Sequence, residues 1–453
     1  MAAKQVVVVA AINRIGNSFY WIVIVLMISL TFGQQSTTGP KSNYVKRVLE
    51  NIEIDFLASY YTQDGDNAAV SGGIGTEDLS DITPTFVISI PLNNDDILKI
   101  DAGISAYTSA SSSNINPFDK INADPYQAST GASKSDVWSN VTGSYIHNSA
   151  DRNTIYSTKL SISSEYDYFS IGFGGGITKL FNNKNTELGA SSNLFIDKWN
   201  SIYPYELRPF SQGGNGIQNE LFTQNLISGD TDYNPSFTKF DESLRKSFSF
   251  GIHFSQIINT KTQAFLSFEI TEQWGQLSTP FHRIYFSDIE DSFIDNFQLA
   301  DDIEHHPDSR NKGAISGRLN YYVNEIFIIR TFYRYYYDNW GISSNTTTIE
   351  IPIKILDNFT FYPSYRYYDQ SAADHFAPSN QHLSTDQYYT SDYDLSAFNS
   401  NQYGFGIKYT DIFTQFRIRN FGLKSINIRY SNYERNSGFK SGIISCGFSF
   451  IRD

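Results

Sequence analysis

Apolar and polar residues alternate along much of this chain, and the alternation is sharpest in the last third. Between positions 347 and 355 the apolar residues are Ile349, Ile351, Ile353 and Ile355, and the residues between them are Thr348, Glu350, Pro352 and Lys354. A strand points successive side chains to opposite faces, so this segment predicts one apolar and one polar face.

About sixteen segments show this alternation, each near the 9–11 residues that a tilted membrane-spanning strand needs. They begin near Glu50, Ile82, Ile97, Val137, Thr154, Tyr168, Thr186, Leu244, Thr262, Gly313, Ile326, Asn345, Asn358, Gln402, Lys424 and Phe439. The last segment ends in alternating phenylalanines, Phe448 and Phe450, as terminal barrel strands often do.

The connections between these segments differ in length according to their order. The long ones are all odd-numbered: Thr62–Asp81, Ala110–Asp136, Lys198–Ser243, Leu277–Lys312 and Gln370–Asn401. The even-numbered ones are mostly tight turns, such as Asn93–Asp96 and Asn182–Asn185. This parity places the long connections at one end of a meander, and a soluble β-sandwich has no reason to keep it. The sequence therefore predicts an all-β fold, a transmembrane up-and-down antiparallel barrel of about sixteen strands with long extracellular loops and short periplasmic turns. In this barrel Ile349, Ile351, Ile353 and Ile355 should contact lipid.

The N-terminal segment has the order of a secretory signal. The apolar run FYWIVIVLMISLTFG ends at Gly33, follows Lys4 and Arg14, and precedes small and polar residues. It is short for a transmembrane helix, although an uncleaved anchor is the alternative. We expect a signal peptide over residues 1–33, a single barrel domain over 34–453, and export to the outer membrane of a Gram-negative cell.

Composition adds few constraints. Aromatic residues make up 16% of the chain, which favours strands. The mean hydropathy of −0.34 does not indicate a soluble protein, because the two faces of barrel strands cancel in an average. The net charge is −13 and no basic stripe is present, so nucleic acid is not an expected partner. The single cysteine, Cys446, forms no internal disulfide and lies too far along the chain to carry a lipid anchor.

Motifs for catalysis are weak. The run IGFGGGITKL lacks the ending of a phosphate-binding loop and lies inside a strand pattern, where close packing or a bulge explains it better. No Ser/His/Asp set has a recognisable spacing. We therefore predict no catalytic residues, no cofactor and no enzyme. The stretch ADDIEHHPDSR could hold a divalent cation, but its spacing matches no metal motif and a solvated loop is the preferred interpretation. Its candidate ligands are Asp301, Asp302, Glu304, His305, His306 and Asp308.

Charged residues recur at polar positions of neighbouring segments. This possible lumen charge band comprises Arg330, Arg334, Asp338, Glu350, Lys354 and Arg366. Its mixed signs favour ion pairs that brace the wall, and a charged constriction that selects solutes is the alternative. The Gln370–Asn401 connection could also fold back as a lid, with Arg334 and Arg366 as partners for its carboxylates.

Several long stretches resemble an uncharacterised outer-membrane barrel family, catalogued as domain of unknown function 3570 and typical of Bacteroidetes. They include SDVWSNVTGSYIHNSADRN, SSEYDYFSIGFGGGITKLFNNKNTEL, LSTPFHRIYF, PDSR, YRYYYDNWGI, YPSYRYYDQSAADHFAP and YYTSDYDLSAFNSNQYGFGIKY. The resemblance implies a barrel. It also hints at an extracytosolic redox system with a small lipoprotein, a thioredoxin-like protein and a flavin-attaching transferase. It supplies no catalytic residues.

Three functions remain open at this point. The leading one is a non-enzymatic barrel in outer-membrane lipid that passes solutes or hosts a partner. The second is a scaffold of a flavinylation-linked redox system that holds a lipoprotein partner. The third is a membrane-embedded hydrolase, which the lack of a recognisable triad disfavours. About sixteen strands leave an aqueous channel unless loops plug it.

Overall fold

The computed structural model describes residues 47–108, 135–211, 227–230, 233–241 and 243–452. All of them belong to one compact unit, Arg47–Asp453. The predicted signal peptide, residues 1–33, lies outside the described residues, as do parts of two expected long connections. Among the described residues, no helix is long and apolar enough to cross a membrane.

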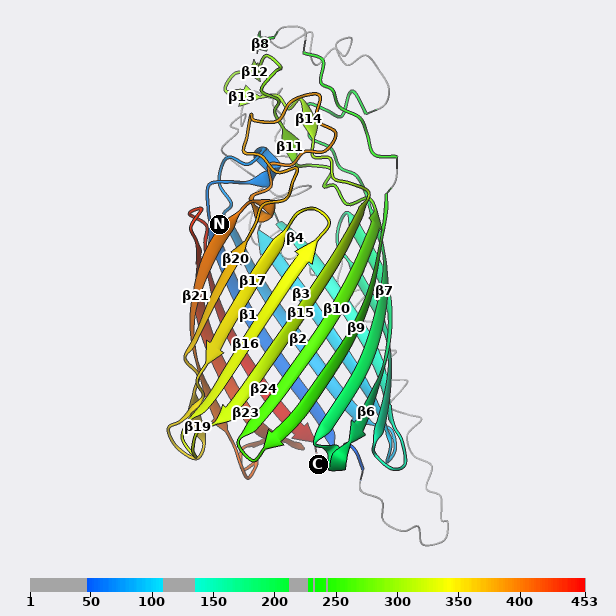
Figure 1. The fold of residues 1–453 in the computed structure, drawn as a ribbon, viewed down its shortest axis with the longest axis vertical. Helices are drawn as coiled ribbons and strands as arrows, with labels where there is room; N and C mark the ends of the chain where they lie inside the picture. The colour runs from blue at the N-terminus through cyan, green and yellow to red at the C-terminus, as the bar shows by residue number, and fades with distance from the viewer. Residues whose placement is uncertain (1–46, 109–134, 212–226, 231–232, 242, 453) are drawn as a thin grey trace. The chain divides into compact units, whose positions relative to one another are not determined.

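The wall is a closed antiparallel barrel in which consecutive strands pair (Figure 1). Its main sheet contains 19 strand segments, which form sixteen wall strands in the described residues. Two wall strands are each built from two segments, and β22 (Arg417–Ile418) lies in a turn. The wall strands are β1 (Ile52–Asp64), β2 (Leu79–Pro91), β3 (Asp96–Thr108), β4 (Ser135–Asn148), β5 (Thr154–Ser164), β6 (Tyr168–Phe181), β7 (Thr186–Trp199), β9 (Leu244–Asn259), β10 (Thr262–Gly275), β15 (Ser309–Tyr322), β16 (Ile328–Asp338), β17 with β18 (Ser343–Glu350, Ile353–Lys354), β19 with β20 (Phe359–Phe361, Ser364–Gln370), β21 (Phe398–Thr410), β23 (Phe421–Arg435) and β24 (Lys440–Arg452).

The barrel closes between its first and last strands. β1 and β24 pair antiparallel from Ile52↔Arg452 to Asp64↔Lys440. The predicted fold class is therefore confirmed, and the predicted strand starts fall within a few residues of the observed ones.

Two prolines interrupt the wall where the sequence predicted one continuous strand. β17 ends at Glu350, two residues before Pro352, and β20 begins at Ser364, directly after Pro363. Proline has no amide hydrogen to donate, so the ladder is broken there. The two strands remain paired across the break, because Ile351 N donates to Pro363 O at 3.0 Å.

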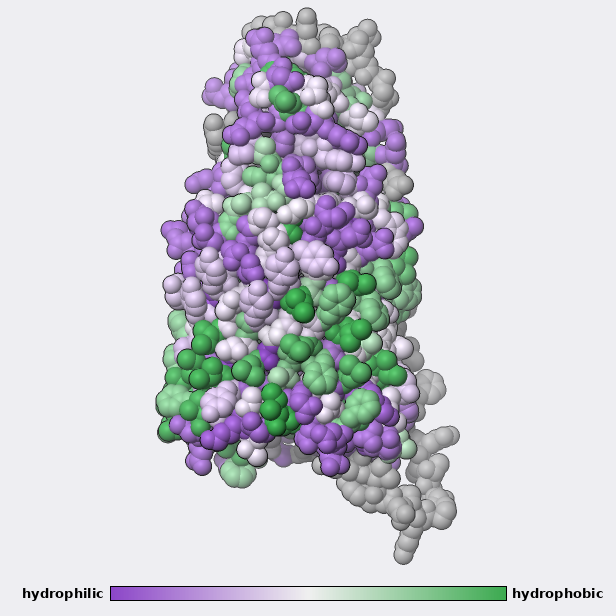
Figure 2. All heavy atoms as spheres, in the orientation of Figure 1, coloured by the Kyte–Doolittle hydropathy of each residue, from purple (hydrophilic) through white to green (hydrophobic). Residues whose placement is uncertain are grey.

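The outer face of the wall is apolar. Ile315, Phe405 and Ile428 keep 54%, 53% and 50% of their surface exposed. Figure 2 shows the most hydrophobic residues gathered in a belt on the half of the barrel nearer the short turns, with more polar residues beyond it. Ile349 and Ile355 are also exposed, at 38% and 58%, while Glu350 between them makes ion pairs inside the barrel. An outward apolar belt is the feature that a lipid-embedded barrel requires.

The glycine-rich run lies inside β6, which pairs with both neighbours without a register shift. Close packing therefore explains it and a bulge does not. A Cβ at Gly174 would lie 2.5 Å from Lys159 Cε, and one at Gly172 would lie 2.5 Å from the Phe195 ring. The glycines leave room for these long side chains to lie over the wall.

The long connections do not remain separate loops. At the end of the barrel that carries them they pack into a compact layer, here called the cap (Figure 1). The cap contains the 3-10 helices η1 (Ala69–Ser71) and η4 (Tyr393–Leu395). It also contains a two-stranded sheet of β11 (Arg283–Ile284) and β14 (Asp302–Ile303), and a three-stranded sheet of β8 (Ile227–Gly229), β12 (Ser292–Ile294) and β13 (Phe297–Gln298).

Candidate functional site

The lumen of the barrel is the first candidate site, and strand alternation decides which side chains line it. On β1 and β24, Tyr60 and Ile444 are register partners on the apolar outer face, so Leu57 and Tyr61 point inward. Leu57 nevertheless keeps 45% of its surface exposed. Glu269 and Arg318, at inward positions on β10 and β15, are exposed as well. The described lumen is therefore wet and is not filled by packed side chains.

The predicted charge band does not form one network. Arg330 and Glu350 are register partners on β16 and β17, and their side chains pair at 2.9 Å. Glu350 also pairs with Arg429 of β23 at 2.9 Å, although two other wall strands lie between them. Arg330 and Arg429 both lie over the ring of Tyr362, at 6.0 and 4.9 Å from its centroid.

Glycines on the intervening strand permit this long-range pair. Gly404 and Gly406 of β21 occupy inward positions, and a Cβ at Gly406 would lie 2.8 Å from Arg429 Cγ. Without side chains there, Glu350 and Arg429 can meet over the wall. This inner brace of Arg330, Glu350 and Arg429 is the kind of ion pairing that the mixed signs of the band suggested.

Asp338 and Lys354 lie apart from the brace. The Asp338 carboxylate accepts hydrogen bonds from Trp340 N and Ile342 N, and pairs with Arg310 at 2.6 Å. It therefore holds the turn after β16 at the cap end of the barrel. Lys354 pairs with Asp357 at 2.8 Å in an exposed short turn. Alternation puts both on the polar face, but because they lie at strand ends they form contacts with residues of the adjacent turns and not with the brace.

Arg334 and Arg366 remain in the lumen without an acidic partner in the described residues. The predicted pairing with the Gln370–Asn401 connection is wrong, because its carboxylate Asp394 pairs instead with Arg435 of β23 at 2.7 Å. Arg366 Nε donates to Thr348 Oγ1 at 3.1 Å. A third inward arginine, Arg318, belongs with them. It is not part of the predicted band, although the alternation of Ile315, Gly317 and Leu319 places it on the polar face.

The inward charges are divided between two halves of the wall. Strands β15 to β23 present mainly cations, while the facing strands β2 to β7 present mainly carboxylates. The basic half contributes Arg310, Lys312, Arg318, Arg330, Arg334, Lys354, Arg366, Lys408, Arg429 and Arg435, against Asp338 and Glu350. The acidic half contributes Asp81, Asp101, Asp136, Glu187 and Asp197, against Lys99 and Lys159. Opposite charges on facing walls of a narrow aqueous space create a field across it.

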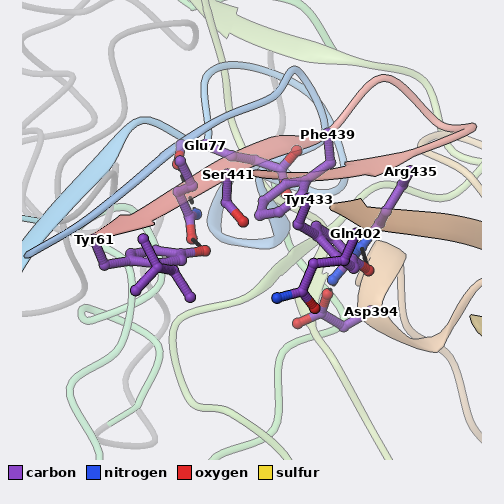
Figure 3. Close-up of a pocket in the computed structure, with 10 residues that line it drawn as sticks. Tyr61, Glu77, Asp394, Gln402, Tyr433, Arg435, Phe439 and Ser441 are labelled. Carbon is purple, nitrogen blue, oxygen red and sulfur yellow. Dashed lines mark hydrogen bonds and ion pairs between the residues drawn. The ribbon is translucent and has the colours of Figure 1, made fainter. Parts of the chain in front are cut away.

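A cavity of about 330 Å³ lies where the cap meets the lumen (Figure 3). Its wall side includes Tyr61, Gln402 and Tyr433, and its cap side includes Glu77 and Asp394. Arg435 also lines it, pairs with Asp394 and lies over the ring of Phe439 at 4.5 Å (Figure 3). Burial raises the pKa of the Glu77 carboxyl in this cavity.

The cap is held by buried polar contacts that the sequence did not reveal. Arg283 and Glu206 have fully buried side chains and form a bidentate pair, with Nε to Oε1 at 2.7 Å and Nη2 to Oε2 at 3.1 Å. Arg283 Nη1 also donates to Val70 O at 3.0 Å. The single guanidinium therefore joins three long connections. Apolar clusters around Leu207, Ile303 and Phe297 surround it.

The predicted cation-binding stretch is part of this cap. Its preferred interpretation as a solvated loop is wrong, because Asp301, Asp302, Glu304 and His306 keep only 6%, 3%, 2% and 8% of their surface exposed. Asp302 accepts from Tyr389 OH, and Glu304 accepts from Thr279 N and Thr390 Oγ1, so these oxygens serve the fold. Among the described residues, no group of three or more His, Cys, Asp or Glu side chains could hold a metal ion.

Histidines surround Glu304 and join two connections. His306 Nε2 lies 3.3 Å from Glu304 Oε2, and His306 Nδ1 lies 2.8 Å from His375 Nε2. Burial, reinforced by the neighbouring His306, lowers the pKa of His375 to about 4. The histidines hold the pKa of Glu304 well below its usual range despite its burial. Trp340 packs on both His306 and His375. A cleft of about 510 Å³ borders Trp340, His375 and His382.

Together these features define a transmembrane barrel with a wet, charge-divided lumen and a packed cap. The chain belongs to the family described as "Protein of unknown function (DUF3570)", which matches residues 106–442. The predicted resemblance is thereby confirmed. No curated protein matches the chain.

Three solved structures are among those to which the chain is similar. A bacterial polysaccharide outer membrane secretin shares 9% identity over 89% of this chain and 98% of that chain, with a TM-score of 0.43. The deltaS2 mutant of the TodX monoaromatic hydrocarbon channel shares 8% over 90% and 91%, with a TM-score of 0.39. The outer membrane protein OpdK from Pseudomonas aeruginosa shares 8% over 88% and 99%, with a TM-score of 0.36.

Proposed function

We propose that this chain is a non-enzymatic channel of the outer membrane that passes small solutes through its lumen. The carrying observation is the exposure of inward side chains, such as Leu57, Glu269 and Arg318, inside a wall whose outer face is apolar. Apolar belt and wet interior together are the arrangement of a barrel that offers water a path through lipid.

The cap is the part of the molecule that controls entry from the long-connection end. It reaches the lumen at the Figure 3 cavity, where Asp394 pairs with the wall residue Arg435. Solutes therefore enter past the cap or displace part of it. Its anchoring by buried groups favours a fixed vestibule over freely moving loops.

Single-channel recording of the refolded full chain tests this function. Discrete conductance steps above the empty-bilayer baseline are expected from protein that first shows a compact unheated band on gels. The same protein denatured before addition serves as control. Correctly folded barrel without conductance contradicts the proposal. A lipoprotein that co-purifies stoichiometrically with such a silent barrel supports the scaffold role instead.

Export by a cleaved signal peptide forms part of the proposal. The apolar Phe19–Gly33 segment motivates it, and the mature chain should start near Gln34. The intact mass of protein extracted from outer membranes measures this directly. A mass that still includes Met1 to Gly33 contradicts cleavage and leaves the channel proposal standing.

A further inference from the structure

Three inward arginines lie close together on the lumen wall, and within the described ranges no carboxylate pairs with them. Arg318 of β15 is the register partner of Phe332, which pairs with Thr348, which pairs with Arg366 of β20. These four residues form one inward row across adjacent strands. Arg334 is the next inward residue after Phe332 on β16. With strands about 4.8 Å apart, the row spans roughly 14 Å along the curved wall, and Arg334 lies beside the row, about 7 Å further along β16.

The contacts of these arginines differ from those of their neighbours. Arg330 and Arg429 share Glu350, Arg310 binds Asp338, and Arg435 binds Asp394. In the part of the chain that the structure describes, Arg318, Arg334 and Arg366 make no ion pair. Arg318 lies over the ring of Phe265 at 5.9 Å, and Arg366 donates one hydrogen bond to Thr348.

We infer that Arg318, Arg334 and Arg366 form a binding site for the oxyanion group of a small solute, a carboxylate or a phosphate, and make the lumen anion-selective. Guanidinium groups present paired donors in the fork geometry that carboxylate and phosphate oxygens match. Like charges on neighbouring strands repel each other, and an anion between them relieves that repulsion. Arginine rings are a recurrent means of selecting anions in pores.

The surroundings refine the class of solute. Phe332 and Tyr368 point inward beside the arginines, and Thr346 and Thr348 supply hydroxyl groups between them. Aromatic faces next to guanidinium groups suit an organic anion with a ring better than a bare inorganic ion. The facing half of the wall, which carries Asp81 and Asp101, repels an anion toward the arginines.

This inference rests on the channel proposal for its conduction arm and is independent of it for its binding arm. The test variant combines Arg318→Gln, Arg334→Gln and Arg366→Gln. The matched control removes the same charge at exposed positions outside the lumen with Lys184→Gln, Lys261→Gln and Lys440→Gln. Both variants must refold to the compact unheated band before they are compared.

In the binding arm, benzoate, inorganic phosphate and neutral glucose are titrated calorimetrically into detergent-solubilised barrel. Benzoate or phosphate should bind the wild type and the control equally, and the arginine variant at least about tenfold more weakly, a loss of about 1.4 kcal/mol. Binding of benzoate alone assigns a ring-bearing carboxylate, and binding of phosphate alone assigns a phosphate group. No binding of either, or equal weakening in the control, overturns the site.

In the conduction arm, the reversal potential across a potassium chloride gradient gives the selectivity of the pore. The wild type and the control should prefer chloride, and the arginine variant should lose most of that preference. A cation-selective wild type overturns the inference while confirming a channel. A silent pore that still binds benzoate through the arginines contradicts only the channel proposal.

Discussion

The barrel wall and the cap bury their apolar side chains in opposite directions. On the wall, Ile315 and Ile428 point outward and stay 54% and 50% exposed. In the cap, Leu207, Ile284 and Ile303 are fully buried. The wall relies on lipid to cover its apolar face, whereas the cap makes its own core as a water-soluble domain does. One chain therefore contains two regions that fold in different surroundings, lipid for the wall and water for the cap, joined at the barrel rim.

The largest expected effect separates the two regions by breaking the cap alone. Arg283→Met leaves the Glu206 carboxylate fully buried without its partner, which should cost about 3–5 kcal/mol of cap stability. Hydrogen exchange of peptides from residues 276–308 measures the cap, and the shift between unheated and boiled gel bands measures the wall. The wall should be unaffected.

The double variant Arg283→Met/Glu206→Leu sharpens that result. Apolar groups of similar size remove the buried charge altogether, so most of the lost protection should return. If the double variant is as open as the single one, the ion pair is not what holds the cap. If the wall also fails to fold, the two regions are not independent.

A second pair of substitutions compares the lipid-facing and the lumen-facing side of one wall strand. Leu160 points outward with 46% of its surface exposed, and the next residue, Ser161, points inward. Leu160→Arg places a charge in lipid and should cost about 2–4 kcal/mol near the bilayer midplane. Ser161→Arg, its matched control, faces water and should cost much less. Urea titration of barrels refolded in vesicles measures both, and equal costs would show that the assigned faces are incorrect.

Protonation of His375 should loosen the cap and spare the wall. The pKa of His375 is lowered to about 4 from an ordinary 6.5, so the unfolded cap binds a proton more readily than the folded one. Between about pH 6.5 and 4, cap stability therefore falls as pH falls, by at most about tenfold in the unfolding equilibrium per pH unit.

Two other cap residues oppose this loss. Glu304 raises the pKa of His282 despite its burial, and burial raises the pKa of Asp301 to about 7, so both bind a proton more readily in the folded cap. Hydrogen exchange at pH 7 and pH 4.5 measures the net effect. His375→Gln should flatten the profile, and an unchanged profile would assign the pH dependence to another group.

The smallest effect is expected at the short turns. Lys354 and Asp357 pair at 2.8 Å, with side chains 47% and 84% exposed. Water screens exposed pairs, so Lys354→Ala should leave the urea midpoint of the barrel unchanged. A measurable shift would mean that Lys354 acts in the lumen, as its alternation first suggested.

The sequence predicted the wall far better than the cap, for a physical reason. In a wall strand, lipid-facing and water-facing residues alternate with a period of two, so the local sequence alone identifies each strand. The same alternation places Arg330 and Glu350 of the brace on the inward face, and it places Arg318 there too. Pro352 and Pro363 interrupt the hydrogen-bond ladder of two wall strands but do not change the order of the strands.

The cap has no such repeat. Arg283 and Glu206 meet across 77 positions of sequence, and His306 meets His375 across 69. Nothing local distinguishes these residues from those of a solvated loop, which is why the stretch around Glu304 was expected to be exposed. The charged residues in the long connections indicate that polar contacts can form there, but they do not indicate which residues are the partners.

The pairing of β1 with β24 has a consequence for how freely the chain could be rewired. Ile52 and Arg452 are partners at the rim that carries the short turns, so a short linker could join them. The chain could then be opened at another turn on that rim, such as the one between Asn259 and Thr262. Every neighbour in the wall would be preserved in such a circular permutant. The identity of the barrel therefore resides in its cyclic order of strands, and the point at which the polypeptide starts is arbitrary to it.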